Sequence, residues 1–446
     1  MKKELLKSSF FNVMSAIFSK GSAIIISIIF ARTLGSESFG YFSIIQAAAS
    51  TLLIFISVGS GVVITKHVAL YLENGGNDKA IGFTSLNLIM SISISILIII
   101  LSVIYSTEIA KALLNNANLY YLVIFSSFIP LFSCFQVVIT GYVNGKKDFK
   151  FNQNSALITG LTSIPISIYL VLEYELVGGV VSLLINQAII ASFYLCYFYK
   201  TCGSNHGNFR ENIKLNYLEF KNIILKDSLP ALLVGLTVTP TLLVIYQIAI
   251  EYNDSGLEIV GQFGAINQWR NLLIFIPSVL GVVFISYFSK YKEDQKYRMY
   301  NIIVPYFCVY SIIFPILLFP EIVLSVYGDS FIGSDFVISL YTVVLACLIV
   351  AVKTAIGREV VFKENYWISA ISNFIWSVSF ISLYFLFVNL GVLGISLSFL
   401  LSHIISLIYF LFRVSYSRVL FKEFLLNKFF IISIFFLLLF LLRFLL

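Results

Sequence analysis

Long apolar runs separated by short polar segments constrain this chain more than any motif does. Crossing a hydrocarbon core about 30 Å thick takes about 20 residues as a helix. Because lipid offers the backbone no hydrogen-bond partners, runs of this length must be helical. The sequence predicts thirteen spans, over residues 10–31, 38–65, 81–104, 119–142, 153–172, 176–199, 229–250, 259–288, 300–325, 336–357, 366–388, 391–412 and 429–446.

Composition agrees with a polytopic membrane protein. Only 11% of the 446 residues are charged and the mean hydropathy is +0.96, whereas a globular domain carries about 25% charged residues. The basic residues behind the net charge of +7 are scattered between the apolar runs, so no nucleic-acid partner is expected. The first run exceeds a signal-peptide core in length and contains Lys20, which favours a retained first span.

The distribution of Lys and Arg predicts the orientation of the chain. With the N-terminus in the cytoplasm, 23 of the 29 basic residues fall in cytoplasmic segments and three fall on the opposite side. An excess of Lys and Arg in short cytoplasmic loops is the bias that orients membrane proteins. The sequence therefore predicts a cytoplasmic N-terminus.

A hydrophilic stretch between the sixth and seventh spans divides the chain. It predicts a cytoplasmic linker over 201–226, between an N-terminal lobe of six helices (1–200) and a C-terminal lobe of six helices (227–413). The last part, 414–446, is expected to hold a cytoplasmic segment and a peripheral thirteenth helix.

The two lobes show weak internal similarity. The second span opens on Gly40-Tyr41-Phe42 and the eighth opens on Gly261-Gln262-Phe263, in the same orientation across the membrane. Parallel repeats of this kind are related by an axis along the membrane normal. The predicted fold class is an all-α polytopic membrane protein, built from two six-helix lobes related by such a pseudo-two-fold axis.

Three basic side chains lie well inside predicted spans: Lys20, Arg270 and Lys353. No Asp or Glu lies near the centre of a predicted span, and Glu321 falls near the end of 300–325. A charge at the bilayer centre costs about 2.5–3.5 kcal/mol on insertion scales, so such residues usually face a cavity or a partner. Three cations without an interior anion predict a cavity for a negatively charged ligand.

Lys20 belongs to a polar stripe on the first span, together with Ser15, Ser19, Ser22 and Ser27. Packing of helices through small residues explains the serines. It does not explain Lys20, which lies about ten residues from either end of the span. We therefore predict that Lys20 lines a cavity, with helix packing as the alternative.

Arg270 lies in the eighth span between Asn267 and Asn271, and its planar guanidinium suits bidentate recognition of phosphate. The alternative is a structural pairing with a polar neighbour. Lys353 lies near the cytoplasmic end of the tenth span, where it either assists binding or snorkels to the interface. The sequence predicts that four residues of these spans contribute to substrate binding: Asn267, Arg270, Asn271 and Lys353.

For three further residues, the sequence allows a structural interpretation and a functional one. Arg32, at the outer end of the first span, either anchors a lipid headgroup or guards an outer mouth as part of the substrate route. His403, midway through the twelfth span, is either a packing residue or a proton carrier that couples transport. Pro240 removes a backbone hydrogen bond from the seventh span and should bend it, which suits a gating helix.

Enzyme signatures are missing from the sequence. There is no HExxH, no Walker loop, no dinucleotide fingerprint and no Cys/His cluster with metal spacing, and the five cysteines form no disulfide framework. We therefore expect no catalytic residues, no metal and no cofactor.

Short motifs give the chain a resemblance to a known family. Phe30-Ala31-Arg32-Thr33-Leu34-Gly35, Phe39-Gly40-Tyr41-Phe42 and Gly261-Gln262-Phe263 with Gln268-Trp269 and Phe275-Ile276-Pro277 resemble O-antigen flippases. These belong to the polysaccharide-transporter branch of the multidrug/oligosaccharidyl-lipid/polysaccharide exporter (MOP) superfamily. The similarity covers about residues 8–413, and its motifs specify the branch better than the substrate.

The resemblance implies a V-shaped, twelve-helix bundle in the bacterial inner membrane. Such a protein moves an undecaprenyl-diphosphate-linked oligosaccharide, such as O-antigen of lipopolysaccharide, to the periplasmic leaflet by alternating access. It implies membrane lipids and polymerase or chain-length proteins of the pathway as partners of a monomer. Related flippases carry cations in helices 1, 2 and 8; here Lys20 and Arg270 match the first and eighth, and the second has none.

Two other functions compete with this interpretation. A cation-coupled multidrug antiporter of the same superfamily needs interior carboxylates. A polyprenyl-glycan polymerase or ligase usually needs a large periplasmic loop, and the outer loops here are short. The sequence favours the flippase.

Overall fold

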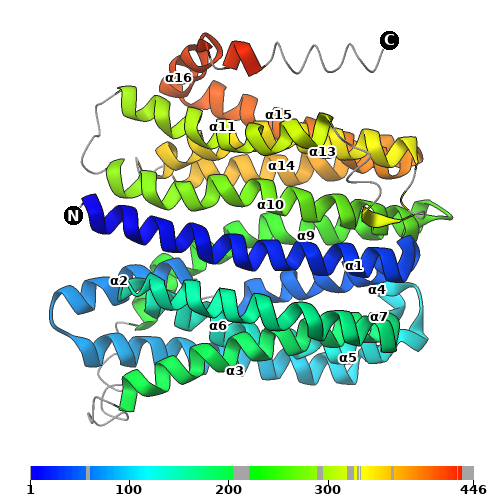
Figure 1. The fold of residues 1–446 in the computed structure, drawn as a ribbon, viewed down its shortest axis with the longest axis horizontal. Helices are drawn as coiled ribbons and strands as arrows, with labels where there is room; N and C mark the ends of the chain where they lie inside the picture. The colour runs from blue at the N-terminus through cyan, green and yellow to red at the C-terminus, as the bar shows by residue number, and fades with distance from the viewer. Residues whose placement is uncertain are drawn as a thin grey trace. The chain divides into compact units, whose positions relative to one another are not determined.

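The computed structural model describes residues 2–56, 61–203, 220–288, 295–318, 326–328, 331, 333–362, 366–428 and 430–433. Throughout these residues the regular elements are helices, and none is a strand (Figure 1). The predicted all-α polytopic class is confirmed.

The N-terminal half of the chain contains two very long helices and several shorter ones. In chain order these are α1 (Lys2–Ile56), α2 (Gly61–Glu73), α3 (Asn77–Ile104), α4 (Ser106–Leu114), η2 (Ala117–Leu119), α5 (Tyr120–Ser127), α6 (Ile129–Gly145) and α7 (Phe149–Gly203).

Helices of 22 to 33 residues dominate the C-terminal half. They follow the short π-helix η3 (Ile224–Ser228) and are α9 (Leu229–Tyr252), α10 (Gly256–Phe288), α11 (Gln295–Leu318), α13 (Ser334–Phe362), α14 (Tyr366–Phe387) and α15 (Gly391–Arg413). The short 3-10 helix η5 (Val388–Leu390) joins α14 to α15, and α16 (Ser415–Leu425) follows α15.

Seven helical segments of the described chain are long and apolar enough to cross a membrane. Three of them are about twice the length that one crossing needs. Phe18–Ile56 reaches from the predicted span 10–31 into 38–65, Phe149–Cys202 covers 153–172 and 176–199, and Trp367–Arg413 covers nearly all of 366–388 and 391–412. The chain is therefore a multi-pass membrane protein.

Backbone breaks divide the two 55-residue helices. In α1, Gly35 has φ 74° and ψ 173°, a conformation that glycine adopts without steric cost. In α7, the break lies at Glu175, with φ 48° and ψ −125°. Each break falls between two predicted spans, so each long helix is a pair of spans joined by a tight turn.

Some predicted segments are described only in part. The predicted span 38–65 covers the end of α1 and the start of α2, and residues 57–60 between these helices lie outside the described residues. The polar residues of the predicted linker over 204–219 lie outside the described residues. So does most of the predicted thirteenth span, 429–446.

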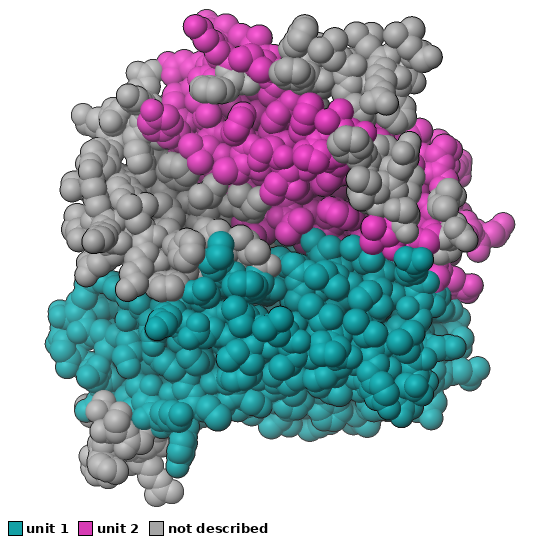
Figure 2. All heavy atoms as spheres, viewed as in Figure 1, with its two compact units in different colours: residues 1–34, 38–247 teal, residues 35–37, 248–446 magenta. Residues whose placement is uncertain are grey.

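The chain divides into two compact units (Figure 2). Unit 1 comprises residues 1–34 and 38–247, and unit 2 comprises 35–37 and 248–446. Most of α9 thus groups with the N-terminal helices, although the prediction assigned it to the C-terminal lobe. The division into lobes at 200 and 227, and the symmetry between them, stay predictions.

In unit 1, two glycines let α6 pack closely on α2. A Cβ atom added at Gly141 would lie 2.7 Å from the Cβ of Ile64, and one added at Gly145 would lie 2.6 Å from Cγ1 of Val68. Thr65 adds a hydroxyl hydrogen bond to the carbonyl of Gly141, at 3.2 Å. Small residues spaced four apart are typical of helices that approach closely in membranes.

In unit 2, the side chains of Arg358 and Asn301 join α10, α11 and α13. Arg358 of α13 donates from Nε to Oδ1 of Asn301 at 3.0 Å and from Nη1 to the carbonyl of Pro277 in α10 at 3.0 Å. Asn301 of α11 is fully buried and donates from Nδ2 to the carbonyl of Ala355 at 2.9 Å. Arg358 is thus a structural cation with several acceptors.

We predict that Gly141→Ala lowers the stability of the protein in detergent by about 1–3 kcal/mol, as overpacking does in a close-packed core. Gly21→Ala is the matched control, because a Cβ at Gly21 meets nothing within 4 Å. Thermal unfolding followed by fluorescence compares them. Equal melting temperatures for the two variants would contradict the role of the α2–α6 contact.

We predict that Asn301→Ala destabilises unit 2 by about 2–3 kcal/mol, because it removes an acceptor from a buried charged donor. Asn389→Ala, at an exposed asparagine of η5, is the control. The measurement is the midpoint of thermal unfolding for both variants. A midpoint for Asn301→Ala that matches the control would show that Arg358 does not depend on this acceptor.

Candidate functional site

Arg270 of α10 is half-buried and held by its own helix. Its Nε donates to Oδ1 of Asn267 at 2.6 Å, and its Nη2 donates to Oδ1 of Asn271 at 3.0 Å. Its guanidinium carbon lies 5.4 Å from the centre of the Phe399 ring of α15, within range of a cation–π interaction. The two asparagines that the sequence placed in the binding site therefore position Arg270 in this structure.

Lys353 of α13 is buried, with 8% of its surface exposed. Most of its side chain is thus enclosed within unit 2. Across the described residues it makes no hydrogen bond or ion pair. A buried ammonium group without an acceptor is costly, so this position favours an anionic partner from outside the protein.

His403 of α15 is buried in an aromatic cluster. Its ring lies 4.5 Å from that of Phe399 and 5.2 Å from that of Trp376 in α14. Among the described residues, neither ring nitrogen of His403 has a hydrogen-bond partner. The indole N–H of Trp376 also has none among them. Polar groups buried in this way usually have a partner, so their lack of one here needs an explanation.

These residues converge in unit 2, although they come from three helices. The charges of Lys353 and Arg270 both act on His403, and Phe399 touches both Arg270 and His403. We call Arg270, Lys353 and His403 the basic cluster. The sequence treated His403 separately from the two cations, and the helix packing brings it beside them.

A buried acid lies near the end of α13, outside the predicted span 336–357. Glu359 is the residue before the last of the apolar segment Ser334–Val360 and is 3% exposed. Its charge acts on the adjacent Arg358. Glu359 is thus associated with the structural cation of unit 2.

In unit 1, the polar stripe of the first span divides between two environments. Ser15 donates to the carbonyl of Asn152 in α7 at 3.1 Å, and Ser22 lies where α1 passes Gly160 of α7. Lys20 is exposed on the surface of unit 1. Helix packing therefore accounts for these serines, as the alternative reading proposed, while Lys20 is accessible to a ligand.

Arg32 and Pro240 lie apart from the basic cluster in sequence and belong to unit 1. Arg32 is exposed, three residues before the break at Gly35. Pro240 is half-buried, and α9 continues through it. Their roles as an outer guard and a gating residue stay predictions.

The chemistry of the basic cluster is one-sided. Lys353, Arg270 and the indole of Trp376 can only donate hydrogen bonds. A site of positive charge and donors, buried among helices, favours a ligand that brings negative charge and acceptors. Trp376 was missed by sequence reasoning because nothing in its neighbourhood distinguishes it from other aromatic residues of apolar spans.

Solved structures show the class of fold. A multidrug resistance MATE family transporter of the MOP superfamily, in an inward-facing conformation, matches with a TM-score of 0.73 at 16% identity, over 93% of this chain and 99% of that one. The lipid II flippase MurJ, in an inward closed conformation, matches with a TM-score of 0.71 at 18% identity, over 97% of each chain.

A third match is a MOP superfamily transporter from Pyrococcus furiosus, described as having a binding pocket of reverse polarity. Its TM-score is 0.67 at 15% identity, over 94% of this chain and 96% of that one. The protein therefore has the fold of MOP superfamily transporters. No curated protein matches the sequence.

The family is shown by sequence. The model of the family described as polysaccharide biosynthesis protein matches residues 5–250, which is more than half of the chain. The chain belongs to this family, and the predicted resemblance to the polysaccharide branch is confirmed. The related structures are of transporters and flippases, which agrees with the prediction that the protein is not an enzyme.

Proposed function

We propose that this protein flips a lipid-linked oligosaccharide from the cytoplasmic to the periplasmic leaflet of the bacterial inner membrane. Its membership of the polysaccharide biosynthesis family supports a glycan substrate. Its fold, shared with a lipid II flippase, supports a lipid-linked one. The substrate we propose is an undecaprenyl-diphosphate-linked repeat unit of O-antigen or a similar surface polysaccharide, and the N-terminus is cytoplasmic.

The observation that carries the proposal is the buried basic cluster of unit 2. A diphosphate brings negative charge and many acceptor oxygens. Arg270 is suited to hold it in a bidentate manner, and its two asparagine contacts fix the direction of the guanidinium. Lys353 supplies a second positive charge, and its lack of a described acceptor is explained if the substrate provides one.

Lys20 supplies a further cation from unit 1. In alternating access, the two halves of the transporter rock about a fixed site. We propose that Lys20 contacts the diphosphate in one of the two states, while the polyprenyl tail stays in lipid. Pro240 would allow α9 to bend during this motion, and Arg32 would act at the outer mouth.

A second candidate is a cation-coupled multidrug antiporter. The likeness to a MATE family transporter and the buried carboxylate of Glu359 favour it. The basic cluster opposes it, because cationic drugs are repelled by Arg270 and Lys353. A deletion strain that becomes sensitive to cationic drugs, with surface glycan unchanged, would favour the antiporter.

We predict that Arg270→Ala abolishes surface glycan in a deletion strain that carries the variant gene. Arg270→Lys should restore only part of it, because an ammonium group cannot form the bidentate contact. Immunoblots of surface glycan measure the effect, and blots of membrane fractions measure protein level.

The matched control for this experiment is Arg413→Ala, at an exposed arginine of unit 2, which should leave glycan display unchanged. Normal display with Arg270→Ala, at native protein level, would refute the role of Arg270. Single repeat units on the surface would instead indicate a polymerase, since a flippase defect leaves none.

We predict that His403→Gln removes any proton dependence of transport if His403 is the coupling residue. The measurement is the rate at which lipid-linked glycan moves from one leaflet of proteoliposomes to the other, as a function of pH. Trp376→Phe, which removes the neighbouring N–H but keeps an aromatic ring beside His403, is the control. A pH dependence that survives His403→Gln would exclude this residue as the proton carrier.

A further inference from the structure

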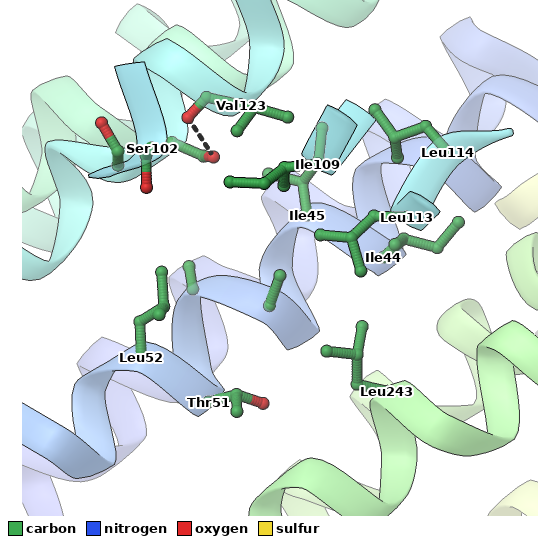
Figure 3. A pocket seen from close by; sticks show the side chains of 14 residues that line it. Ile44, Ile45, Thr51, Leu52, Ser102, Ile109, Leu113, Leu114, Val123 and Leu243 are labelled. Carbon is green, nitrogen blue, oxygen red and sulfur yellow. Dashed lines mark hydrogen bonds between the residues drawn. The ribbon is translucent and has the colours of Figure 1, made fainter. Parts of the chain in front are cut away.

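Two features of the described residues play no part in the proposed transport. One is a cavity of about 170 Å³ in unit 1, which lies among apolar side chains such as Ile45, Leu113 and Leu243 (Figure 3). None of its lining residues carries a charge, so it has no group that would select a charged ligand. The other is the surface around α16 in unit 2, where basic residues gather.

α16 begins where a membrane span ends. The apolar segment Trp367–Arg413 ends with α15. Val414 then has φ −123° and ψ 103°, an extended conformation, so the helix is interrupted before α16 starts at Ser415 (Figure 1). A helix of 11 residues is about 16–17 Å long, which is too short to cross the hydrocarbon core. α16 therefore starts at the boundary between hydrocarbon and water.

One side of α16 is fixed to the part of unit 2 that lies in the membrane. Phe424 is buried, and the centre of its ring lies 5.1 Å from that of Tyr306 in α11 and 4.7 Å from that of Phe430. Tyr306 belongs to the apolar segment Arg298–Leu318, and its hydroxyl lies 2.9 Å from that of Ser433. These contacts hold α16 at the membrane boundary.

The exposed side chains around α16 are of two kinds. Among the described side chains of residues 412–432, those that are exposed are basic or apolar, and none is acidic or uncharged polar. The basic ones are Arg413, Arg418, Lys422 and Lys428. Phe412 and Leu426 are the most exposed of the apolar ones, at 76% and 67%. Basic and apolar side chains together are typical of helices that lie in the membrane interface.

Both kinds of side chain share the side of α16 that faces away from unit 2. With a rotation of about 100° per residue, Arg418, Val419 and Lys422 lie about 120–160° from Phe424 around the helix axis. Leu426 follows the last turn in a helical conformation and lies on the same side. Glu423 is the one acid of this part of the sequence and is half-buried, so the exposed charge is positive.

We propose that this side of α16 binds anionic phospholipids of the bilayer. A phospholipid brings a phosphate and acyl carbons to the same place, which matches basic and apolar side chains that are interleaved. Each Lys or Arg close to an anionic leaflet adds to the attraction. An acidic region of a soluble protein would match the basic side chains, but it would leave Val419 and Leu426 without an apolar partner.

The first test is native mass spectrometry of the purified full chain with added lipid. The probes are phosphatidylglycerol, which is anionic, and phosphatidylcholine with the same acyl chains, which has no net charge. We expect phosphatidylglycerol to bind at least fivefold more tightly. Equal affinity for the two lipids would overturn the proposal and would favour an acidic protein partner for this surface.

A double variant locates the binding on α16. Arg418→Gln with Lys422→Gln should lower the affinity for phosphatidylglycerol at least fivefold and leave that for phosphatidylcholine unchanged. Lys79→Gln with Lys150→Gln removes the same charge at two exposed lysines of unit 1 and is the matched control, with no loss expected. Full affinity for phosphatidylglycerol in the α16 variant would overturn the proposal.

Hydrogen exchange provides an independent measurement on the unaltered chain in nanodiscs. Amides of α16 should exchange at least threefold more slowly in phosphatidylglycerol than in phosphatidylcholine, because bound lipid opposes local opening of the helix. Amides of α14, which lies within an apolar segment, are the internal control and should exchange equally in both. Equal exchange of α16 in the two lipids would contradict the proposal. Neither experiment measures transport, so both results are independent of the proposed function.

Discussion

A positive charge among buried helices needs hydrogen-bond acceptors or an anion close to it. The structure of unit 2 depends on which acceptors each of its cations has. Arg358 is met by the side chain of Asn301 and by two backbone carbonyls. Arg270 is met by two asparagines of its own helix and by an aromatic face. Lys353 is buried with no such acceptor among the described residues. The same chemistry thus gives one structural cation and, in our proposal, two that serve a ligand.

This difference explains why the candidate site lies where α10, α13 and α15 pack. Desolvation raises the cost of an unpaired charge and equally raises the value of an anion that pairs with it. In our proposal, the diphosphate is held strongly at this site, yet it must also leave. Helices that can shift relative to one another provide release, because a small displacement of one cation weakens the whole site.

The sequence predicted the helices well, because hydropathy over about 20 residues is a local property. It also predicted Lys20, Arg270 and Lys353 as site residues, since a charge in an apolar run is visible without a structure; their role in binding stays a prediction. It did not find that His403 and Trp376 join two of these cations, because that depends on the rotation and packing of four helices. It assigned Asn267 and Asn271 to the ligand, whereas a spacing of three and one residues lets them reach Arg270. Glu359 was missed because α13 continues beyond the apolar run.

Asn301 and Arg358 have a consequence for how the protein comes apart. Asn301 both donates to α13 and accepts from it, and Arg358 also reaches α10. Extraction of α11 would remove the two acceptors that Asn301 gives Arg358, and extraction of α10 would remove the carbonyl of Pro277. Under mechanical pulling, α10, α11 and α13 should therefore leave the bilayer in a single cooperative event, and proteases that drag proteins from membranes would meet one high barrier here.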